Sequence, residues 1–241
     1  MSGRDRVLGR IRRALGEPGA GGTGIGRATG EPGAGGTGIG RATGEPGAGE
    51  AGIPRDYLRV HGDRTPAESA DLLAANLTEY RAKVHRTDEA GLAPLLARLL
   101  AERGARTVLV PPGLPPSWLD AAQAARVEDR SDSTPYALDA VDSVVTGCAL
   151  AVAETGTIVL DGGPDQGRRR ITLIPDHHIC VVRVPGQLVD SVPQALERLD
   201  PARPLTWISG PSATSDIELD RVEGVHGPRT LEVVLIDAPA Q

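Results

Sequence analysis

The stretch HICVVRVPGQLVDSVPQALERL, residues 178–199, decides the fold class. Its first seven residues are almost all apolar, which is typical of a strand buried on both faces of a parallel sheet. After a Pro-Gly pair, residues 186–199 show helical apolar spacing, with Pro193 near enough to the start to be tolerated. A buried strand followed by a helix predicts an α/β domain whose mostly parallel sheet is covered on both faces.

The same alternation extends outward from this stretch in both directions. Thr65, Pro66 and Glu68 fit an N-cap, a first helical position and a capping box, so a helix is expected to begin there. Only a short loop separates residues 156–161 from 171–175, which predicts an antiparallel hairpin inside or beside the sheet. The predicted helices are 64–84, 88–105 and 215–222, and the further predicted strands are 106–113, 143–147, 156–161, 171–175, 204–209 and 231–237.

The N-terminal part of the chain has a different character. Residues 4–15 place Val7, Leu8, Ile11 and Leu15 on one helical face, which predicts a short amphipathic helix. The 14-residue sequence GEPGAGGTGIGRAT at 16–29 is repeated without change at 30–43 and then truncated. Such a glycine-rich segment buries too little apolar surface to offset its ordering entropy. The predicted organisation is a helix at 1–15, a disordered linker at 16–52 and an α/β domain at 53–241.

Composition and charge narrow the function classes. The net charge of −6 and the scarcity of aromatic residues argue against nucleic acid as a partner. The sequence has no apolar run of about 18 residues and no secretory h-region, so we expect no membrane span and a cytoplasmic location. Cys148 and Cys180 are the only cysteines, too few for a cluster site, so no iron–sulfur cluster is expected on this chain. The cofactor is otherwise unknown.

Two hydroxyl-rich motifs are candidate binding sites. GPSATSDIE at 210–218 follows a predicted strand, and Ser212 and Thr214 add hydroxyl groups to the free N–H groups of a helix start, which favours an anion. The alternative is that the motif only caps a helix, through Ser215 and Glu218. AETGT at 153–157 offers Glu154 as a general base, and the alternative is a turn whose carboxylate pairs with an arginine.

Two further motifs carry basic side chains. GPDQGRRR at 163–170 follows a glycine-rich turn, where Arg168 would suit a carboxylate or phosphate, and the alternative is a solvated turn. Alternation should send Arg169 to the opposite face from its neighbours. The adjacent His177 and His178 also point to opposite faces in a strand, so one metal ion is not expected to bind both, and no metal site is predicted.

The run AETGTIVL…GRRRITLIPDHHICVV…LTWISGPSATSDIE…GVHGPR resembles the lactate utilization protein C family, within the LUD-domain group. The resemblance covers about residues 1–15 and 52–241, and the repeat is an insertion. It implies a three-layer α/β/α fold similar to the NagB/RpiA/CoA-transferase-like proteins. It also implies a component of a system oxidising L-lactate to pyruvate, whose companion subunits carry iron–sulfur clusters. A stand-alone enzyme of the cyclo-ligase or acyl-transfer type using Glu154 is the alternative.

The motifs together suggest one crevice for a small organic acid. GPSATSD and HGPR at 226–229 would share it with Glu154 and Thr155, provided that the chain turns back early after residue 212 and that strand 231–236 runs antiparallel to strand 205–208. Otherwise both motifs only shape turns. Glu154 and His226 are the candidate catalytic residues, and the candidate ligand-binding residues are Thr155, Gly156, Thr157, Arg168, Gly210, Ser212, Thr214, Asp216, Gly227 and Arg229.

Overall fold

The computed structural model of the chain describes residues 58–214, 222–223 and 227–237. The predicted helix at 1–15 and the predicted linker at 16–52 lie outside these residues, as does most of the predicted helix 215–222. Within the described ranges, no helix has the length and apolar character needed to cross a membrane.

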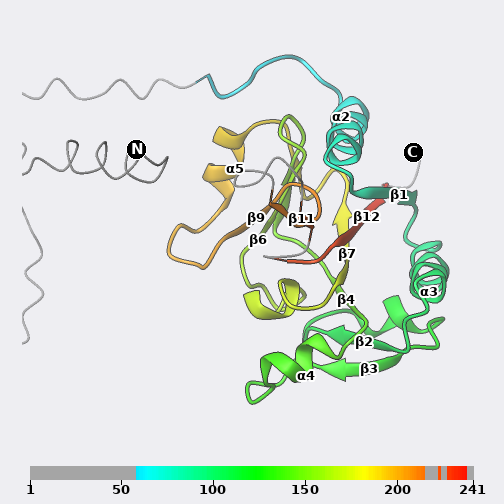
Figure 1. The fold of residues 1–241 in the computed structure, drawn as a ribbon. Helices are drawn as coiled ribbons and strands as arrows, with labels where there is room; N and C mark the ends of the chain where they lie inside the picture. The colour runs from blue at the N-terminus through cyan, green and yellow to red at the C-terminus, as the bar shows by residue number, and fades with distance from the viewer. Residues whose placement is uncertain (1–57, 215–221, 224–226, 238–241) are drawn as a thin grey trace, which may run out of the picture. The chain divides into compact units, whose positions relative to one another are not determined.

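A six-stranded sheet forms the centre of the domain (Figure 1). Its order is β1-β12-β7-β4-β2-β3, and every neighbouring pair is parallel, which confirms the prediction of a mostly parallel sheet. The buried residues of β7 and β12 place the apolar runs of the sequence in the middle of this sheet. The six strands are β1 (Lys83–Thr87), β2 (Thr107–Val110), β3 (Ala125–Glu128), β4 (Ser143–Thr146), β7 (His177–Arg183) and β12 (Thr230–Ile236).

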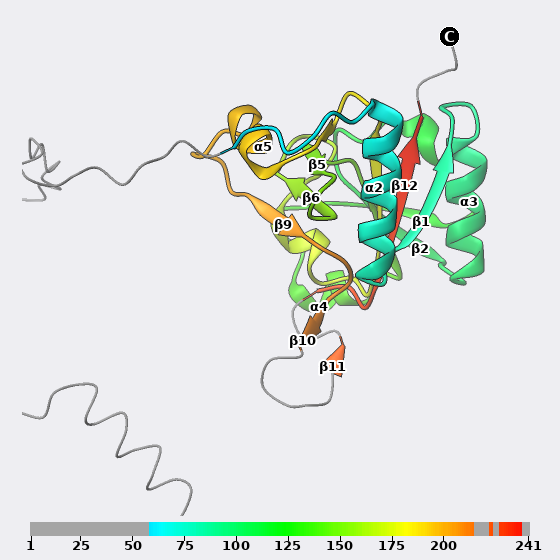
Figure 2. The same cartoon turned by 90° about the horizontal axis from the view of Figure 1, so that it is seen from above.

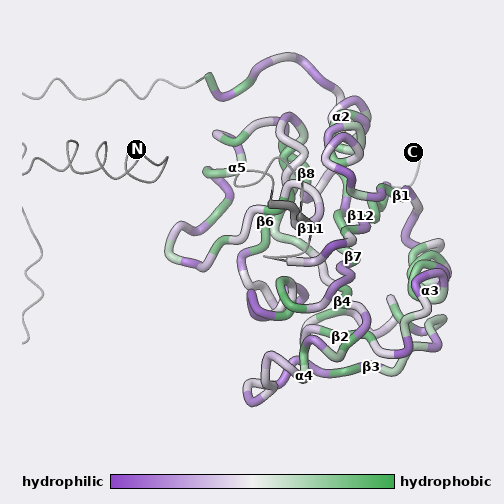
Figure 3. The backbone as a smooth tube through the Cα atoms, viewed as in Figure 1, coloured by the Kyte–Doolittle hydropathy of each residue, from purple (hydrophilic) through white to green (hydrophobic). Residues whose placement is uncertain are grey.

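Helices cover both faces of this sheet. In Figure 2, α2 (Pro66–Glu79) and α3 (Leu92–Glu102) lie on opposite sides of β12. Ile179 and Val181 of β7 pack with α3 and with η1 (Pro116–Leu119), whereas Cys180 and Val182 pack with α2. In Figure 3 much of α3 and β2 has hydrophobic colours, and both elements contribute to the core on the α3 side. Alternation along each strand therefore supplies two separate cores.

A second sheet of four strands lies on the α2 side. β6 pairs antiparallel with β5 and with β9, and β5 pairs parallel with β8. One side of this sheet, including Ala151 and Ile158, joins the core under α2, while Leu150 and Val159 pack against α5. The elements are β5 (Leu150–Val152), β6 (Thr157–Leu160), β8 (Leu188–Val189), β9 (Thr206–Ile208) and α5 (Val192–Arg198).

The predicted hairpin between 156–161 and 171–175 is wrong. Residues 157–160 form β6, whose partners are β5 and β9, and the second segment begins in a 3₁₀ helix, η2 (Arg169–Thr172). Ile171 and Ile174 pack on the same cluster beneath β2 and β4, and a spacing of three residues suits a helical turn rather than a strand. α4 (Pro135–Asp139), which supplies Leu138 to this cluster, was not predicted.

Three other boundaries differ from the prediction. α2 begins at the predicted capping box of Thr65 and Glu68 but ends at Glu79, because Arg81 takes a φ of 69° and turns the chain into β1. The predicted helix 186–199 divides into β8 and α5, with Ser191 and Gln194 forming a capping box between them. Near the other end, Val222, which the prediction made the last residue of the helix 215–222, instead begins a short strand. This strand, β11 (Val222–Glu223), pairs antiparallel with β10 (Ala213–Thr214).

Both cysteines lie in the core beneath α2. Cys148 and Cys180 are buried, and neither forms a disulfide. Cys180 Sγ lies 3.6 Å from the carbonyl oxygen of Gly147. These thiols therefore belong to the packing between the two sheets.

Candidate functional site

A cavity of about 300 Å³ lies between the six-stranded sheet and the edge strand β9; we call it the inter-sheet cavity. It contains Gly210, Ser212 and Gly227, three of the residues that the sequence analysis selected. Its lining residues are Arg169, Thr172, Leu173, His178, Thr206, Trp207, Ile208, Ser209, Gly210, Pro211, Ser212, Gly227, Pro228 and Leu231.

The two motifs from the end of the chain meet at this cavity. The backbone N–H of Ser212 donates to the carbonyl oxygen of Pro228 at 2.8 Å. β9 leads into the first motif and β12 leads out of the second, and the two strands belong to different sheets and do not pair with each other. The contact between Ser212 and Pro228 therefore ties the two sheets together. His226 and Asp216 lie outside the described residues, and Thr214 is described only as part of β10.

His178 forms part of the cavity lining from β7. Its Nε2 lies 2.7 Å from Thr146 Oγ1, whereas Nδ1 has no hydrogen-bond partner among the described residues. Burial and, to a lesser degree, the neighbouring His177 lower the pKa of His178 to about 3. The ring is therefore neutral at physiological pH, with one nitrogen left for a ligand.

Arg169 supplies positive charge at the same cavity. Its side chain is exposed and forms no ion pair or hydrogen bond with the described part of the chain. It also borders a neighbouring cavity of about 500 Å³ beside the glycine-rich turn 162–167. Arg168 lines only that second cavity, and its Nε binds both carboxylate oxygens of Asp129 at 3.0 Å. Arg169, rather than Arg168, is thus the arginine available to an anion.

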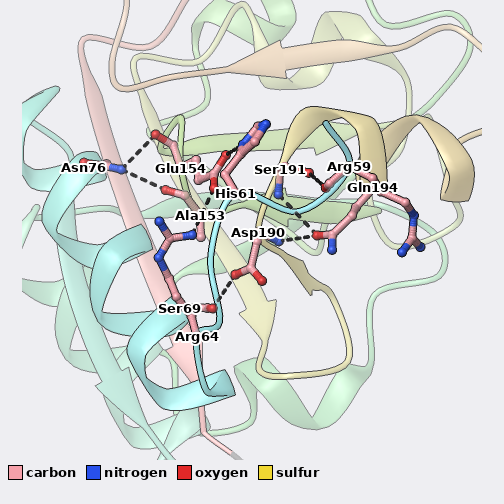
Figure 4. A network of polar contacts seen from close by, with 10 residues as sticks. All are labelled: Arg59, His61, Arg64, Ser69, Asn76, Ala153, Glu154, Asp190, Ser191 and Gln194. Carbon is pink, nitrogen blue, oxygen red and sulfur yellow. Dashed lines mark hydrogen bonds and ion pairs between the residues drawn. The ribbon is translucent and has the colours of Figure 1, made fainter. Parts of the chain in front are cut away.

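Glu154 lies in a different place, in a polar network with the segment that precedes α2 (Figure 4). Its two carboxylate oxygens contact His61 Nδ1 at 2.6 Å and Arg64 Nη1 at 2.9 Å. Asn76 of α2 donates to the backbone carbonyl groups of Ala153 and Glu154. Burial favours a higher pKa for Glu154, but the bonds from His61 and Arg64 outweigh it and lower the pKa. The carboxylate is therefore ionised near neutral pH, but it is a weaker base than an ordinary carboxylate and both of its oxygens are already bonded, which does not suit a general base.

The rest of the AETGT turn connects this network to the cavity. Thr155 Oγ1 donates to Thr157 Oγ1 at 2.8 Å, and Thr157 Oγ1 lies 2.8 Å from Ser209 Oγ in the cavity wall. Gly156 has a φ of 56°, and a Cβ atom there would lie 2.8 Å from Asn76 Cβ. Gly156 therefore permits close approach to α2, a structural role that its selection as a ligand-binding residue did not consider.

Arg229 lies outside the cavity lining. Its Nε donates to Asp176 Oδ1 at 2.5 Å, and Asp176 also binds Arg103 at the end of α3. Of the predicted residues, the structure brings Gly210, Ser212 and Gly227 together, with Thr157 one hydrogen bond away. Glu154, Arg168 and Arg229 lie elsewhere.

A second polar cluster lies on the opposite face of the sheet, where the strands begin; we call it the amino-edge network. His177 Nδ1 lies 2.8 Å from Ser143 Oγ, and its Nε2 lies 3.3 Å from Glu232 Oε1. The other oxygen of Glu232 lies 2.7 Å from His85 Nε2, and Lys83 Nζ lies 3.7 Å from Oε1. Every side chain of this network therefore has a partner.

Sequence reasoning did not select His178, Thr146 or Arg169. The signal that could have found His178 is alternation, which sends it to the face opposite to His177. The same expectation for Arg169 is wrong, because Arg169 begins the 3₁₀ helix η2 and does not lie in a strand. The histidine pair was weighed only as a metal site. In the described part of the chain, no group of three or more potential metal ligands occurs.

Comparison with known proteins identifies the relatives of this chain. Residues 70–236 match the LUD domain. Lactate utilization protein C of Deinococcus radiodurans is 47% identical over 164 residues, which cover 66% of this chain and 76% of that protein. Lactate utilization protein C of Bacillus pumilus is 32% identical over 187 residues, which cover 73% of this chain and 71% of that protein.

A solved structure supports the same relationship. The crystal structure of a DUF162 family protein from Deinococcus radiodurans matches with a TM-score of 0.61 and 37% identity, covering 72% of this chain and 99% of that chain. The domain match spans both sheets, and the relatives and the solved structure each cover about two thirds or more of the chain. The chain therefore belongs to the LUD-domain family.

Proposed function

We propose that this protein is a component of a cytoplasmic L-lactate utilization system that oxidises L-lactate to pyruvate. Its relatives carry the name lactate utilization protein C, which supports a role in the same process. It acts as the component without iron–sulfur clusters, beside companion subunits that carry them. Its two cysteines are buried in the core beneath α2, which supports this division of roles.

The inter-sheet cavity is the proposed site for the small organic acid. The observation that carries this proposal is buried His178, whose Nδ1 has no partner among the described residues, in the lining of a cavity that Arg169 also borders. A buried polar atom without a partner costs free energy unless a ligand or water satisfies it. The guanidinium of Arg169, which has no partner among the described residues, can offer a paired hydrogen bond to a carboxylate. A three-carbon acid is small enough for this cavity to hold it together with water.

The cyclo-ligase or acyl-transfer alternative receives little support from the surroundings of Glu154. Its carboxylate is held by two basic groups, its pKa is lowered, and the inter-sheet cavity is lined by other residues. Ion pairing with Arg64 and His61 instead suits a role in fastening the segment before α2 to the domain.

Growth on L-lactate tests the proposed function. A deletion strain should fail to grow on L-lactate, and the full chain should restore growth. Arg169→Gln should restore growth poorly, because the variant lacks the proposed carboxylate partner. Arg98→Gln is the matched control, since Arg98 is exposed on α3 and pairs only with Glu102 in the described residues. Full growth of the deletion strain without the chain would contradict the proposal.

A further inference from the structure

We propose that the Thr146–His178 pair recognises the 2-oxygen of a short 2-hydroxy or 2-oxo monocarboxylate in the inter-sheet cavity. The inference rests on the proposed function and specifies the substrate class of its site. It assigns a role to Thr146 and His178, two buried residues. Neither has a part in the alternative function, in which Glu154 is the catalytic residue.

The geometry leaves one nitrogen of the imidazole for a ligand. Thr146 Oγ1 occupies Nε2 at 2.7 Å, and both residues are almost fully buried. Nδ1 is the one buried side-chain nitrogen or oxygen of the described residues that lacks a partner. His178 is among the residues that line the cavity, and the inference assigns the missing bond to a ligand that approaches from this side. The adjacent His177 is also buried, but both of its ring nitrogens have side-chain partners. The same part of the sheet can therefore provide two partners for a buried imidazole.

The threonine hydroxyl allows either tautomer of the ring. When Nε2–H donates to Thr146 Oγ1, Nδ1 is an acceptor and suits the hydroxyl of a 2-hydroxy acid. When Thr146 Oγ1–H donates to Nε2, Nδ1–H is a donor and suits the carbonyl oxygen of a 2-oxo acid. Rotation of one hydroxyl group and relocation of one proton thus adapt the same pair to both acids, with no change in net charge.

The neutral state of the ring makes this exchange possible. Burial holds the pKa of His178 at about 3, so the imidazolium form, in which both nitrogens donate, is rare near neutral pH. Arg169 supplies the positive charge that the carboxylate needs, at the border of the same cavity. The two residues therefore divide recognition between the carboxylate and the 2-oxygen.

Calorimetry with three acids of similar size tests the assignment on the full chain. L-lactate carries a 2-hydroxyl, pyruvate carries a 2-oxo group, and propionate carries neither. Lactate and pyruvate should bind at least about tenfold more tightly than propionate, because propionate leaves Nδ1 unpaired. Equal binding of propionate and lactate, or no binding of any of the three acids, would overturn the inference.

Variants of the pair provide the second arm. In Thr146→Val/His178→Phe both partners become apolar together, so neither is left unpaired, and the three acids should bind within about twofold of one another. Thr146→Ser keeps the hydroxyl group and should keep the preference. A double variant that folds and still prefers lactate over propionate would contradict the proposal.

Nitrogen-15 spectra of the histidine rings test the tautomer directly, and the comparison of the two acids is made on the unaltered chain. The five histidines give few enough signals to assign with the His178→Phe variant. Lactate should place the proton on Nε2 of His178, and pyruvate should place it on Nδ1. The same tautomer with both acids would refute the exchange. If this inference fails while Arg169→Gln still fails to restore growth on lactate, the proposed function stands without it.

Discussion

His177 and His178 are neighbours in β7, yet their rings differ in hydrogen bonding. His177 belongs to the amino-edge network, and His178 lines the inter-sheet cavity. His177 faces α3, where Ser143 and Glu232 occupy both of its nitrogens. His178 faces the second sheet, where Thr146 occupies one nitrogen and the other has no partner in the described residues. A single step along a strand separates the two environments.

The comparison indicates which buried polar residues of this domain contribute to stability and which contribute to binding. A buried polar group that is fully paired stabilises one arrangement of the strands. A buried polar group that is left unpaired weakens the fold and is retained where a ligand completes it. The amino-edge network should therefore govern unfolding, and the inter-sheet cavity should govern binding.

Glu232→Ala should have the largest effect on stability. The side chain is almost fully buried and joins His177 to His85, so its removal leaves two imidazole nitrogens without their partner. We expect a loss of about 3 kcal/mol in the free energy of unfolding, measured by urea denaturation. Glu232→Gln keeps most of the hydrogen bonding and should lose less. If both variants unfolded like the original chain, the network would not be the stabilising region.

Gly210→Ala and Gly227→Ala should distinguish an effect on stability from an effect on binding in the cavity. Gly210 has a φ of 83°, and a Cβ atom there would lie 2.4 Å from the carbonyl oxygen of Tyr80, so alanine should cost about 2 kcal/mol. At Gly227 the nearest atom to such a Cβ is Ser212 Cβ at 3.5 Å, an ordinary contact. Gly227→Ala should thus unfold normally and change only the binding of L-lactate. Equal melting temperatures for the two variants would contradict this distinction.

The acid dependence of stability should report on His178. Its pKa is about 3 in the folded chain and 6.5 is its ordinary value, so the unfolded chain binds the extra proton between these pH values. The free energy of unfolding should therefore decrease as pH falls from about 6.5 toward 3, by roughly 1 kcal/mol per pH unit from this residue. Carboxylates with lowered pKa, such as Glu232, add to the same trend. His178→Phe should reduce the slope, and an unchanged slope would show that His178 is solvated.

Glu154→Gln should have the smallest effect. The residue is partly buried and its partners are more exposed, so the ion pairs with Arg64 and His61 are weakened by solvent. We expect a loss of about 0.5–1 kcal/mol at neutral pH, which disappears as pH falls below the ordinary carboxylate pKa of 4.5. Growth on lactate should persist. If the variant lost growth on lactate without losing stability, Glu154 would have a role in the reaction itself.

Hydrophobic pattern located four of the six strands of the central sheet, namely β2, β4, β7 and β12, but not β1 or β3. The apolar runs of β7 and β12 are long and buried, so periodicity located them and indicated parallel pairing. Short elements were harder, because β1 has only partly buried or exposed residues and η2 has an apolar run that resembles a strand. In both cases, tertiary contacts decide the conformation.

The candidate site was only partly predictable from the sequence. Motif composition located Gly210, Ser212 and Gly227, which the backbone bond between Ser212 and Pro228 brings together. Glu154 and Arg168 looked equally suitable, because a sequence does not reveal that His61, Arg64 and Asp129 already occupy them. His178 required a further piece of information, namely which side chains on the facing strands leave a nitrogen unpaired.

The reaction of the two buried cysteines with a thiol reagent would report how often the domain opens locally. Burial and the bond to Cys180 raise the pKa of Cys148, so this thiol is both shielded and protonated in the folded chain. A thiol reagent can then react only when α2 and the second sheet separate from the six-stranded sheet. The labelling rate would count these separations, and a ligand that fills the inter-sheet cavity would lengthen the interval between them.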